Sequence, residues 1–244
     1  MKFATLFLIY SLTANLSLTE GQTNPTARAA GRLPALEGKL DKHIDDFKTS
    51  GRTLISTVVD LAYEYQLPMG IEYVDRDATT RPLDLELHHE SLRGILAAVV
   101  AQLPEYRVSF LGEVVQIYSP QAREDSSNML NKLIRDFSVD TVDTRQADLE
   151  LACSLSRELK AAAFCGGSIA DGQWGLLKIT LHVRNARVYE ILNAIVQENG
   201  QAIWTVTASQ EKLSKMETGG LWHIYPLQTP FKVPVLDRLT NLSP

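Results

Sequence analysis

The sequence predicts an α+β protein of two tandem small modules, each with two helices packed on a small mixed sheet around a β-α-β-β-like core. Three observations predict this fold. Short stretches alternate apolar and polar residues, as half-buried strands do. The stretches that follow carry apolar residues at helical spacing. The same order of strand, helix and hairpin occurs twice, starting at Leu83 and again at Ile179.

The composition is that of an ordinary globular protein, with 244 residues, 45% of them hydrophobic and 22% charged. This length allows one large domain or two small ones. The net charge of −5 argues against a nucleic-acid-binding protein, which usually carries a basic surplus. Two cysteines are too few for a disulfide scaffold or for a four-cysteine zinc site.

The N-terminal residues 1–21 have the pattern of a signal peptide. A basic start at Lys2 precedes an apolar stretch that has no charge before Glu20. The stretch is too short and too rich in Ser and Thr for a membrane span. We therefore expect cleavage near Gln22 and a periplasmic or secreted protein that is not an integral membrane protein. A buried N-terminal helix or a retained anchor is the alternative.

Residues 22–35 show no periodicity and contain two prolines and a glycine, so they form a linker into the folded part. The strand and helix that follow Leu83 span 83–87 and 92–103, and their second copies span 179–183 and 188–196. The apolar positions of the two copies are in the same phase.

A hairpin follows each of these helices. The expected strand pairs are 106–110 with 114–118, and 202–206 with 221–225. The first pair has a short connection and the second a longer polar insertion. Trp204 and Trp222 fit the apolar faces of these strands and are expected in the core.

The segments upstream of the two copies are also alike. Residues 40–47 and 130–137 share Leu, Lys, Ile, Asp and Phe at the same spacing. We expect both to be helical and each to precede another helix, with apolar stripes over 54–65 and 151–159. A short strand is then expected in each copy, at 70–74 and 162–165.

The predicted modules are residues 36–120 and 129–228, joined by the charged linker 121–128 and followed by an extended tail, 229–244. Each module would pack its two helices on one face of a sheet of about four strands. Ser126, Ser127 or Asn128 would cap a helix that opens at Met129. Duplication explains the shared order of all the elements. The alternative is that two amphipathic segments look alike for physical reasons alone.

The modules resemble the short N-terminal (STN) domain of secretins and TonB-dependent receptors. That family runs as a helix, a strand, a strand with leucine at every second residue, a helix and a hairpin. The matching segments are 53–62, 70–74, 83–87 and 91–96 in the first module, and 179–183 and 188–192 in the second. The resemblance rests on hydrophobic pattern.

The resemblance implies a free-standing protein of the bacterial cell envelope. In that family these domains make protein–protein contacts, building rings in secretins and signalling to an inner-membrane regulator in receptors. They have no catalysis of their own. We therefore expect another envelope protein as the partner, while the identity of that partner and the oligomeric state stay open.

The sequence contains none of the hydrolase, zinc-protease, P-loop or dinucleotide-binding signatures. We expect no catalytic residues, no cofactor and no metal site. His88 and His89 form the nearest cluster, but adjacent residues of a strand point to opposite faces and do not share a ligand. His182 and His223 are expected on strands, facing outward. They would lie close together if those strands pair, but they would still lack a third ligand.

Cys153 and Cys165 are candidates for a disulfide, because an exported protein meets oxidising conditions. The alternatives are two buried thiols or a reactive cysteine. Trp174, in a glycine-rich loop, is a possible contact residue, or else a lid on the core.

The sequence favours a non-catalytic interaction protein of the envelope, an adaptor associated with secretion or signalling. Such a protein would use an exposed sheet edge or helix face. One alternative is a small exported hydrolase with a cysteine or metal site. The other is a small-ligand binder that uses the groove between the modules.

Overall fold

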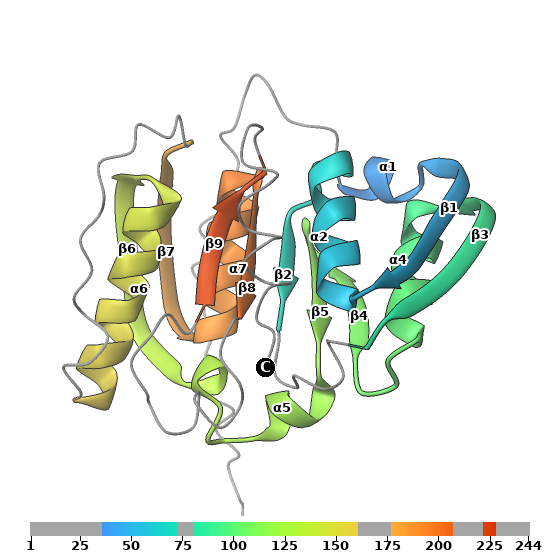
Figure 1. Ribbon diagram of the computed structural model, residues 1–244. Coiled ribbons are helices and arrows are strands. Elements are labelled where there is room, and N and C mark those ends of the chain that lie inside the picture. The colour runs from blue at the N-terminus through green and yellow to red at the C-terminus, as the bar shows by residue number, and fades with distance from the viewer. Residues whose placement is uncertain (1–35, 73–80, 161–176, 207–221, 228–244) are drawn as a thin grey trace, which may run out of the picture. The chain divides into compact units, whose positions relative to one another are not determined.

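The fold is given by a computed structural model that describes residues 36–72, 81–160, 177–206 and 222–227 (Figure 1). The described helices and strands belong to one compact unit. They form an α+β fold, as predicted. The predicted signal peptide 1–21, linker 22–35 and tail 229–244 lie outside the described residues. Within the described residues, no helix has the length and apolar character needed to cross a membrane.

The elements fall into a first half, residues 36–118, and a second half, residues 133–226. The first half comprises α1 (Leu36–Leu40), β1 (His43–Arg52), α2 (Leu54–Tyr65), β2 (Met69–Ile71), β3 (Leu83–Ser91), α4 (Leu92–Ala101), β4 (Arg107–Leu111) and β5 (Val114–Tyr118). The second half comprises β6 (Leu133–Val142), α6 (Thr144–Leu159), β7 (Ile179–Arg187), α7 (Val188–Asn199), β8 (Ala202–Val206) and β9 (Trp222–Pro226). Between the halves lie α5 (Pro120–Glu124) and the 3-10 turn η1 (Met129–Asn131).

The strands form sheets differently from our expectation of a separate sheet of about four strands for each module. The halves share one five-stranded sheet with the order β4-β5-β2-β8-β9. The short strand β2 pairs in parallel with β5 on one side and with β8 of the second half on the other. We call this β2–β8 contact the seam. Pairing both edges of β2 satisfies backbone groups that an isolated module would leave open.

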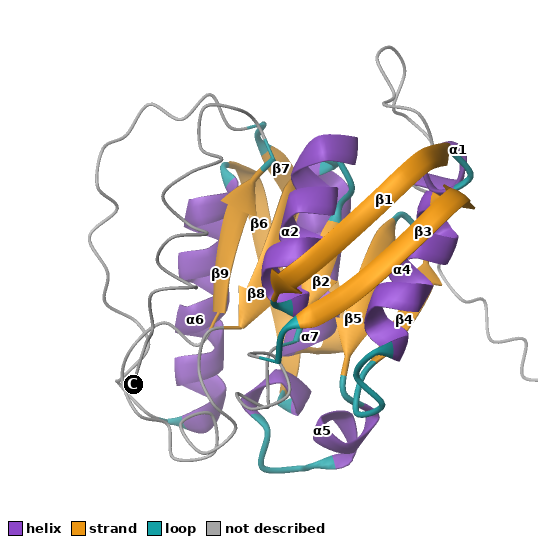
Figure 2. Cartoon of the chain, turned by 45° about the vertical axis from the view of Figure 1, so that its right-hand side comes forward, coloured by secondary structure: helices purple, strands orange, loops and turns teal. Residues whose placement is uncertain are grey.

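The remaining described strands form two antiparallel two-stranded ribbons, β1–β3 and β6–β7. Helices α2 and α4 contact the β1–β3 ribbon, and α4 also contacts β4. Figure 2 shows β1 and β3 in front of these two helices, with the shared sheet behind them. In the same way, α6 contacts β6 and β9, while α7 contacts β7 and β8. The helices therefore fill the space between a ribbon and the shared sheet.

The segments 40–47 and 130–137 are largely strand, so the expectation that they are helical is wrong. In the ribbons, Ile44 pairs with Glu90 and Phe47 with Leu87. His89 lies between these two partners with a φ of 52°. The left-handed backbone of His89 interrupts the alternation of inward and outward side chains in the ribbon. Ile44 and Phe47 therefore both pack against the core, although they are three residues apart. That spacing resembles a helical period. Met129 opens only a short 3-10 turn, and of the three candidate caps it is Asn128 that caps it, by accepting from Leu130 N–H.

The two halves agree in detail beyond the order of their elements. The first residue of α4, Leu92, donates its N–H to Lys42 O at 2.9 Å, and that of α7, Val188, donates to Lys132 O at 3.1 Å. Left-handed residues also recur at matching places, in the C-caps of α2 and α6 and within both ribbons. These pairs are Gln66 with Lys160, Gly51 with Thr141, and His89 with Asn185.

The predicted helical stripes form the core. The inward positions of α4 and α7 are almost completely buried in both helices. They are Leu92, Ile95, Leu96, Val99, Val188, Ile191, Leu192 and Ile195. Trp204 and Trp222 are buried as expected.

Candidate functional site

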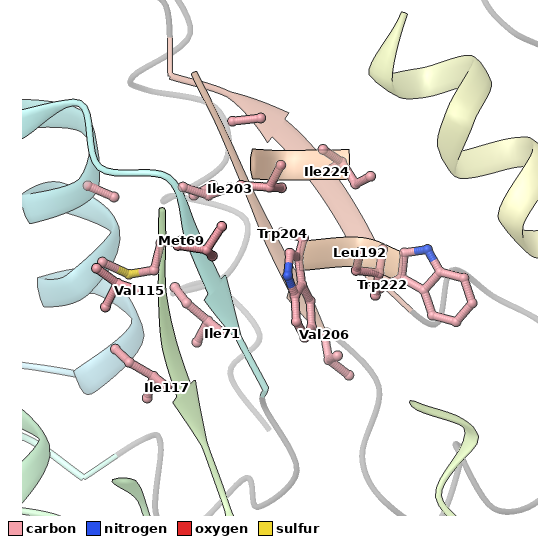
Figure 3. Packing of buried hydrophobic residues seen from close by; sticks show 14 of the residues in the cluster. Met69, Ile71, Val115, Ile117, Leu192, Ile203, Trp204, Val206, Trp222 and Ile224 are labelled. Carbon is pink, nitrogen blue, oxygen red and sulfur yellow. The ribbon is translucent and has the colours of Figure 1, made fainter. Parts of the chain in front are cut away.

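The two halves meet closely at the seam, where Gly70 of β2 pairs with Trp204 of β8. Trp204 Nε1 donates to Asn193 Oδ1 of α7 at 2.9 Å, and the indole is completely buried. Figure 3 shows the apolar side chains that continue from Val115 on β5 across β2 to Trp204. Helix α7 contacts β2 and β5 as well as its own strand β8. The seam is therefore part of the core.

A polar group of five residues lies next to the seam, and we call it the Arg123 cluster. Its members are Glu72, Gln116, Tyr118, Arg123 and Tyr189. Arg123 Nε and Nη2 donate to Glu72 Oε1 at 2.8 and 2.6 Å, and Nη2 also donates to Gln116 Oε1 at 2.7 Å. The guanidinium carbon lies 3.8 Å from the ring centre of Tyr118 and 4.4 Å from that of Tyr189. One cation thus joins β5, the residue after β2, and α7.

The carboxylate of this cluster is almost completely enclosed. The Glu72 side chain is 1% exposed and that of Arg123 is 18% exposed. Desolvation raises the pKa of Glu72 above its usual value, although its hydrogen bond to Arg123 and the guanidinium charge act in the opposite direction. Glu72 Oε2 is buried and has no hydrogen-bond partner among the described residues. Removing Arg123 would therefore leave an uncompensated buried carboxylate.

Local sequence explains how Arg123 reaches this place. Ser119 caps α5 by accepting from Ala122 N–H, and Pro120 occupies the first turn, where it is compatible with a helix. We expected residues 121–128 to be only a charged linker, so the sequence analysis missed Arg123 and Glu72. The feature of the sequence that could have indicated this cluster is Glu72, a lone acidic residue directly after the short apolar strand β2.

The histidines of the β1–β3 ribbon do not converge. His88 Nδ1 lies 2.8 Å from Asp46 Oδ1, whereas His89 Nδ1 lies 3.4 Å from Asp45 Oδ1. All four side chains are more than two-thirds exposed. The two imidazoles therefore have different partners, as expected for adjacent strand residues. Within the described ranges, no three His, Cys, Asp or Glu side chains are placed to hold a metal ion.

His182 and His223 are not brought together, because β7 and β9 belong to different sheets. His182 is exposed, as expected, and its Nδ1 lies 2.7 Å from Ser138 Oγ. His223 was expected to face outward, but it is partly buried, its ring 5.9 Å from that of Tyr225. This burial lowers the pKa of His223.

A second carboxyl, that of the partly buried Asp148 of α6, accepts a hydrogen bond from Trp222 Nε1 of β9 at 2.5 Å. Burial raises the pKa of Asp148 to about 7, although the bond from the indole acts against the rise. No sequence pattern singles out Asp148. Its carboxyl can hold or release a proton near neutral pH, but its only partner given by the structure is the indole.

Cys153 lies in α6, where it is partly buried and is not a free thiol. Cys165 lies outside the described residues, so the pairing of the two cysteines stays a prediction. The possible contact residue Trp174 also lies outside the described residues.

The described site is thus a closed electrostatic junction. The Arg123 guanidinium lies over two tyrosine rings and is bonded to a carboxylate and an amide. Such an arrangement fixes segments relative to one another. No family model matches the chain, and neither a curated protein nor a solved structure matches it significantly.

Proposed function

We propose that this protein is an exported, non-catalytic interaction protein of the bacterial cell envelope, built from two STN-like modules with the bounds 36–120 and 129–228. It acts as an adaptor in secretion or signalling. A single observation carries the proposal: each half repeats the same ribbon, helices and hairpin with the same pairing register. Phe47 pairs with Leu87 in the first half, and Phe137 pairs with Val183 in the second.

The element order supports the relationship to STN domains. The order α2, β2, β3, α4 and the β4–β5 hairpin agrees with the helix, strand, strand, helix and hairpin expected for that family. The matching left-handed residues support duplication, because the left-handed region is costly for most side chains and is not expected at the same places by chance.

The surfaces of the ribbons support a role in binding to proteins. Both ribbons carry charged and polar side chains on their exposed face, with small ion pairs between neighbours such as Lys48 and Glu86. The carboxyls of Glu72 and Asp148 are bonded to an arginine and to a tryptophan. Both carboxyls therefore have partners within the fold itself.

Export and the disulfide belong to the same proposal. Residues 1–21 act as a signal peptide, and Cys153 bonds to Cys165 once the chain reaches an oxidising compartment. The absence of a free thiol at Cys153 supports this pairing.

The proposal is tested by affinity capture with the chain from Gln22 onward as bait in an envelope extract, followed by reconstitution. We expect an exported protein that also binds the purified bait in a second, independent assay. Recovery of no such partner would contradict the proposal. Metal analysis and a thiol count on the same preparation separate it from the hydrolase: a bound metal or a reactive thiol favours the enzyme.

A further inference from the structure

The outer edge of β4 corresponds to the edge of β8 that the chain covers by pairing it with β2. Strands β4 and β8 each follow the second helix of their half and open a hairpin. On its outer side β8 pairs with β2, and all five of its residues are buried. Among the described strands, β4 pairs only with β5. Its Arg107 is exposed, and Val108, Ser109 and Phe110 are only partly buried.

The pairing register shows which backbone groups face outward. Leu111 and Val114 close the hairpin turn at Gly112 and Glu113, so this pair exchanges hydrogen bonds. Bonded and non-bonded pairs alternate along an antiparallel ladder. The N–H and C=O groups of Val108 and Phe110 therefore point away from β5.

We propose that two copies of this chain pair along β4, antiparallel and about a two-fold axis at Ser109. The two five-stranded sheets then continue into one. In this register Val108 of each copy lies opposite Phe110 of the other. The outward backbone groups of these residues form four hydrogen bonds, and the side chains form two apolar cross-strand pairs.

Charge at the ends of β4 favours a second copy as the occupant. Arg107 begins the strand and Glu113 follows its end, and both side chains are exposed. The antiparallel arrangement brings Arg107 of one copy to the end of the interface at which the hairpin turn of the other carries Glu113. The two-fold axis repeats this arrangement of opposite charges at the other end.

The test is sedimentation of the mature chain over a concentration range from about 1 μM to about 1 mM, since a contact along one strand falls among the small, weak interfaces. We expect a concentration-dependent dimer. R107E places like charges together and should weaken the dimer by about tenfold or more. The double variant R107E/E113R should restore it. V108P removes an outward N–H, together with some of the packing of Val108 against the core, and should abolish the dimer.

A control makes the result specific. R135E changes an arginine that is 82% exposed on β6 and should leave the dimer unchanged. A wild-type chain that stays monomeric, or a dimer insensitive to R107E and V108P, overturns the inference. A monomer that still captures an envelope protein would overturn it and leave the proposed function standing.

Discussion

The indole of Trp204 occupies the space that a side chain at residue 70 would need. A Cβ built on Gly70 would lie 2.5 Å from Trp204 Nε1 and 2.8 Å from Asn193 Oδ1. Real Cβ atoms do not approach other atoms so closely. The first half thus leaves a vacancy on β2 that the second half fills, so the sequences of the two halves are matched to each other at the seam.

We expect Gly70→Ala to lower the free energy of unfolding by about 1–3 kcal/mol, because overpacking a tight core forces neighbouring side chains or backbone to shift. Chemical denaturation of the purified chain measures this. Gly38→Ala in α1 is the matched control, since a Cβ there meets nothing within 4 Å. If both variants unfold at the same denaturant concentration as the wild type, the seam is looser than described.

Replacing Arg123 with alanine tests the Arg123 cluster. The Glu72 carboxyl would be left buried without its cation, which costs about 3–5 kcal/mol of folding stability. Arg123→Lys keeps the charge but loses the bidentate fork and the stacking on Tyr118 and Tyr189, so we expect an intermediate loss.

Arg135→Ala is the control for this change. That arginine is 82% exposed and lies 3.8 Å from Glu158, and an exposed pair contributes about 0–1 kcal/mol. Equal losses for Arg123→Ala and Arg135→Ala would show that the cluster does not hold the halves together.

The alternating and helical patterns of the sequence were enough to predict β3, α4, β7, α7 and both hairpins. These elements have one buried face and one exposed face, so their periods are visible locally. The β1 and β6 strands were missed because a left-handed residue in the partner strand, His89 or Asn185, changes which residues face inward. The spacing of apolar residues in one strand gives no information about a left-handed residue in its partner strand.

The site was largely unpredictable for a related reason. Arg123 gains its importance from Tyr189, which lies far along the chain, and from the Glu72 carboxyl that the sheet buries. The shared sheet was also unforeseen, since the pairing of three residues of β2 with β8 depends on the fit of Gly70 to Trp204. Contacts between residues so far apart in the sequence produce no periodic pattern of apolar residues.

Asp148 predicts a pH dependence of stability. Its pKa of about 7 in the folded chain lies above the ordinary value of 3.8, so between these limits the folded chain keeps a proton that the unfolded chain has lost. The stabilising contribution is complete below about pH 4 and is lost as the pH rises through 7. Asp148→Asn should therefore raise the free energy of unfolding at pH 8 by up to about 4 kcal/mol and change little at pH 4.

Denaturation at pH 4, 6 and 8 would measure this difference. Asp136→Asn on β6, where the side chain is exposed, serves as the control. An Asp148→Asn variant whose stability follows the wild type at every pH would contradict a raised pKa at this residue.

The proposed bond between Cys153 and Cys165 predicts a thiol-free mature chain. Alkylation without a reductant should leave the intact mass unchanged, and alkylation after reduction should add two groups. The double variant Cys153→Ser/Cys165→Ser should lose about 3 kcal/mol of stability, because the unfolded chain regains the entropy of a closed loop. Alkylation of the untreated exported chain would disprove the bond.

The left-handed residues of the ribbons predict that glycine stabilises the chain at His89 and Asn185 and destabilises it at the neighbouring His88. His89 has a φ of 52°, which costs a side chain about 1–2 kcal/mol and costs glycine nothing. His89→Gly should therefore raise the thermal midpoint, since the exposed pair with Asp45 contributes little. His88→Gly, one residue earlier in ordinary extended backbone, should lower the midpoint through chain entropy. Asn185→Gly should act like His89→Gly but less strongly, because asparagine tolerates this conformation better. If His89→Gly destabilises the chain as much as His88→Gly does, the irregularity is absent from β3, and the explanation given for the inward-facing Ile44 and Phe47 fails with it.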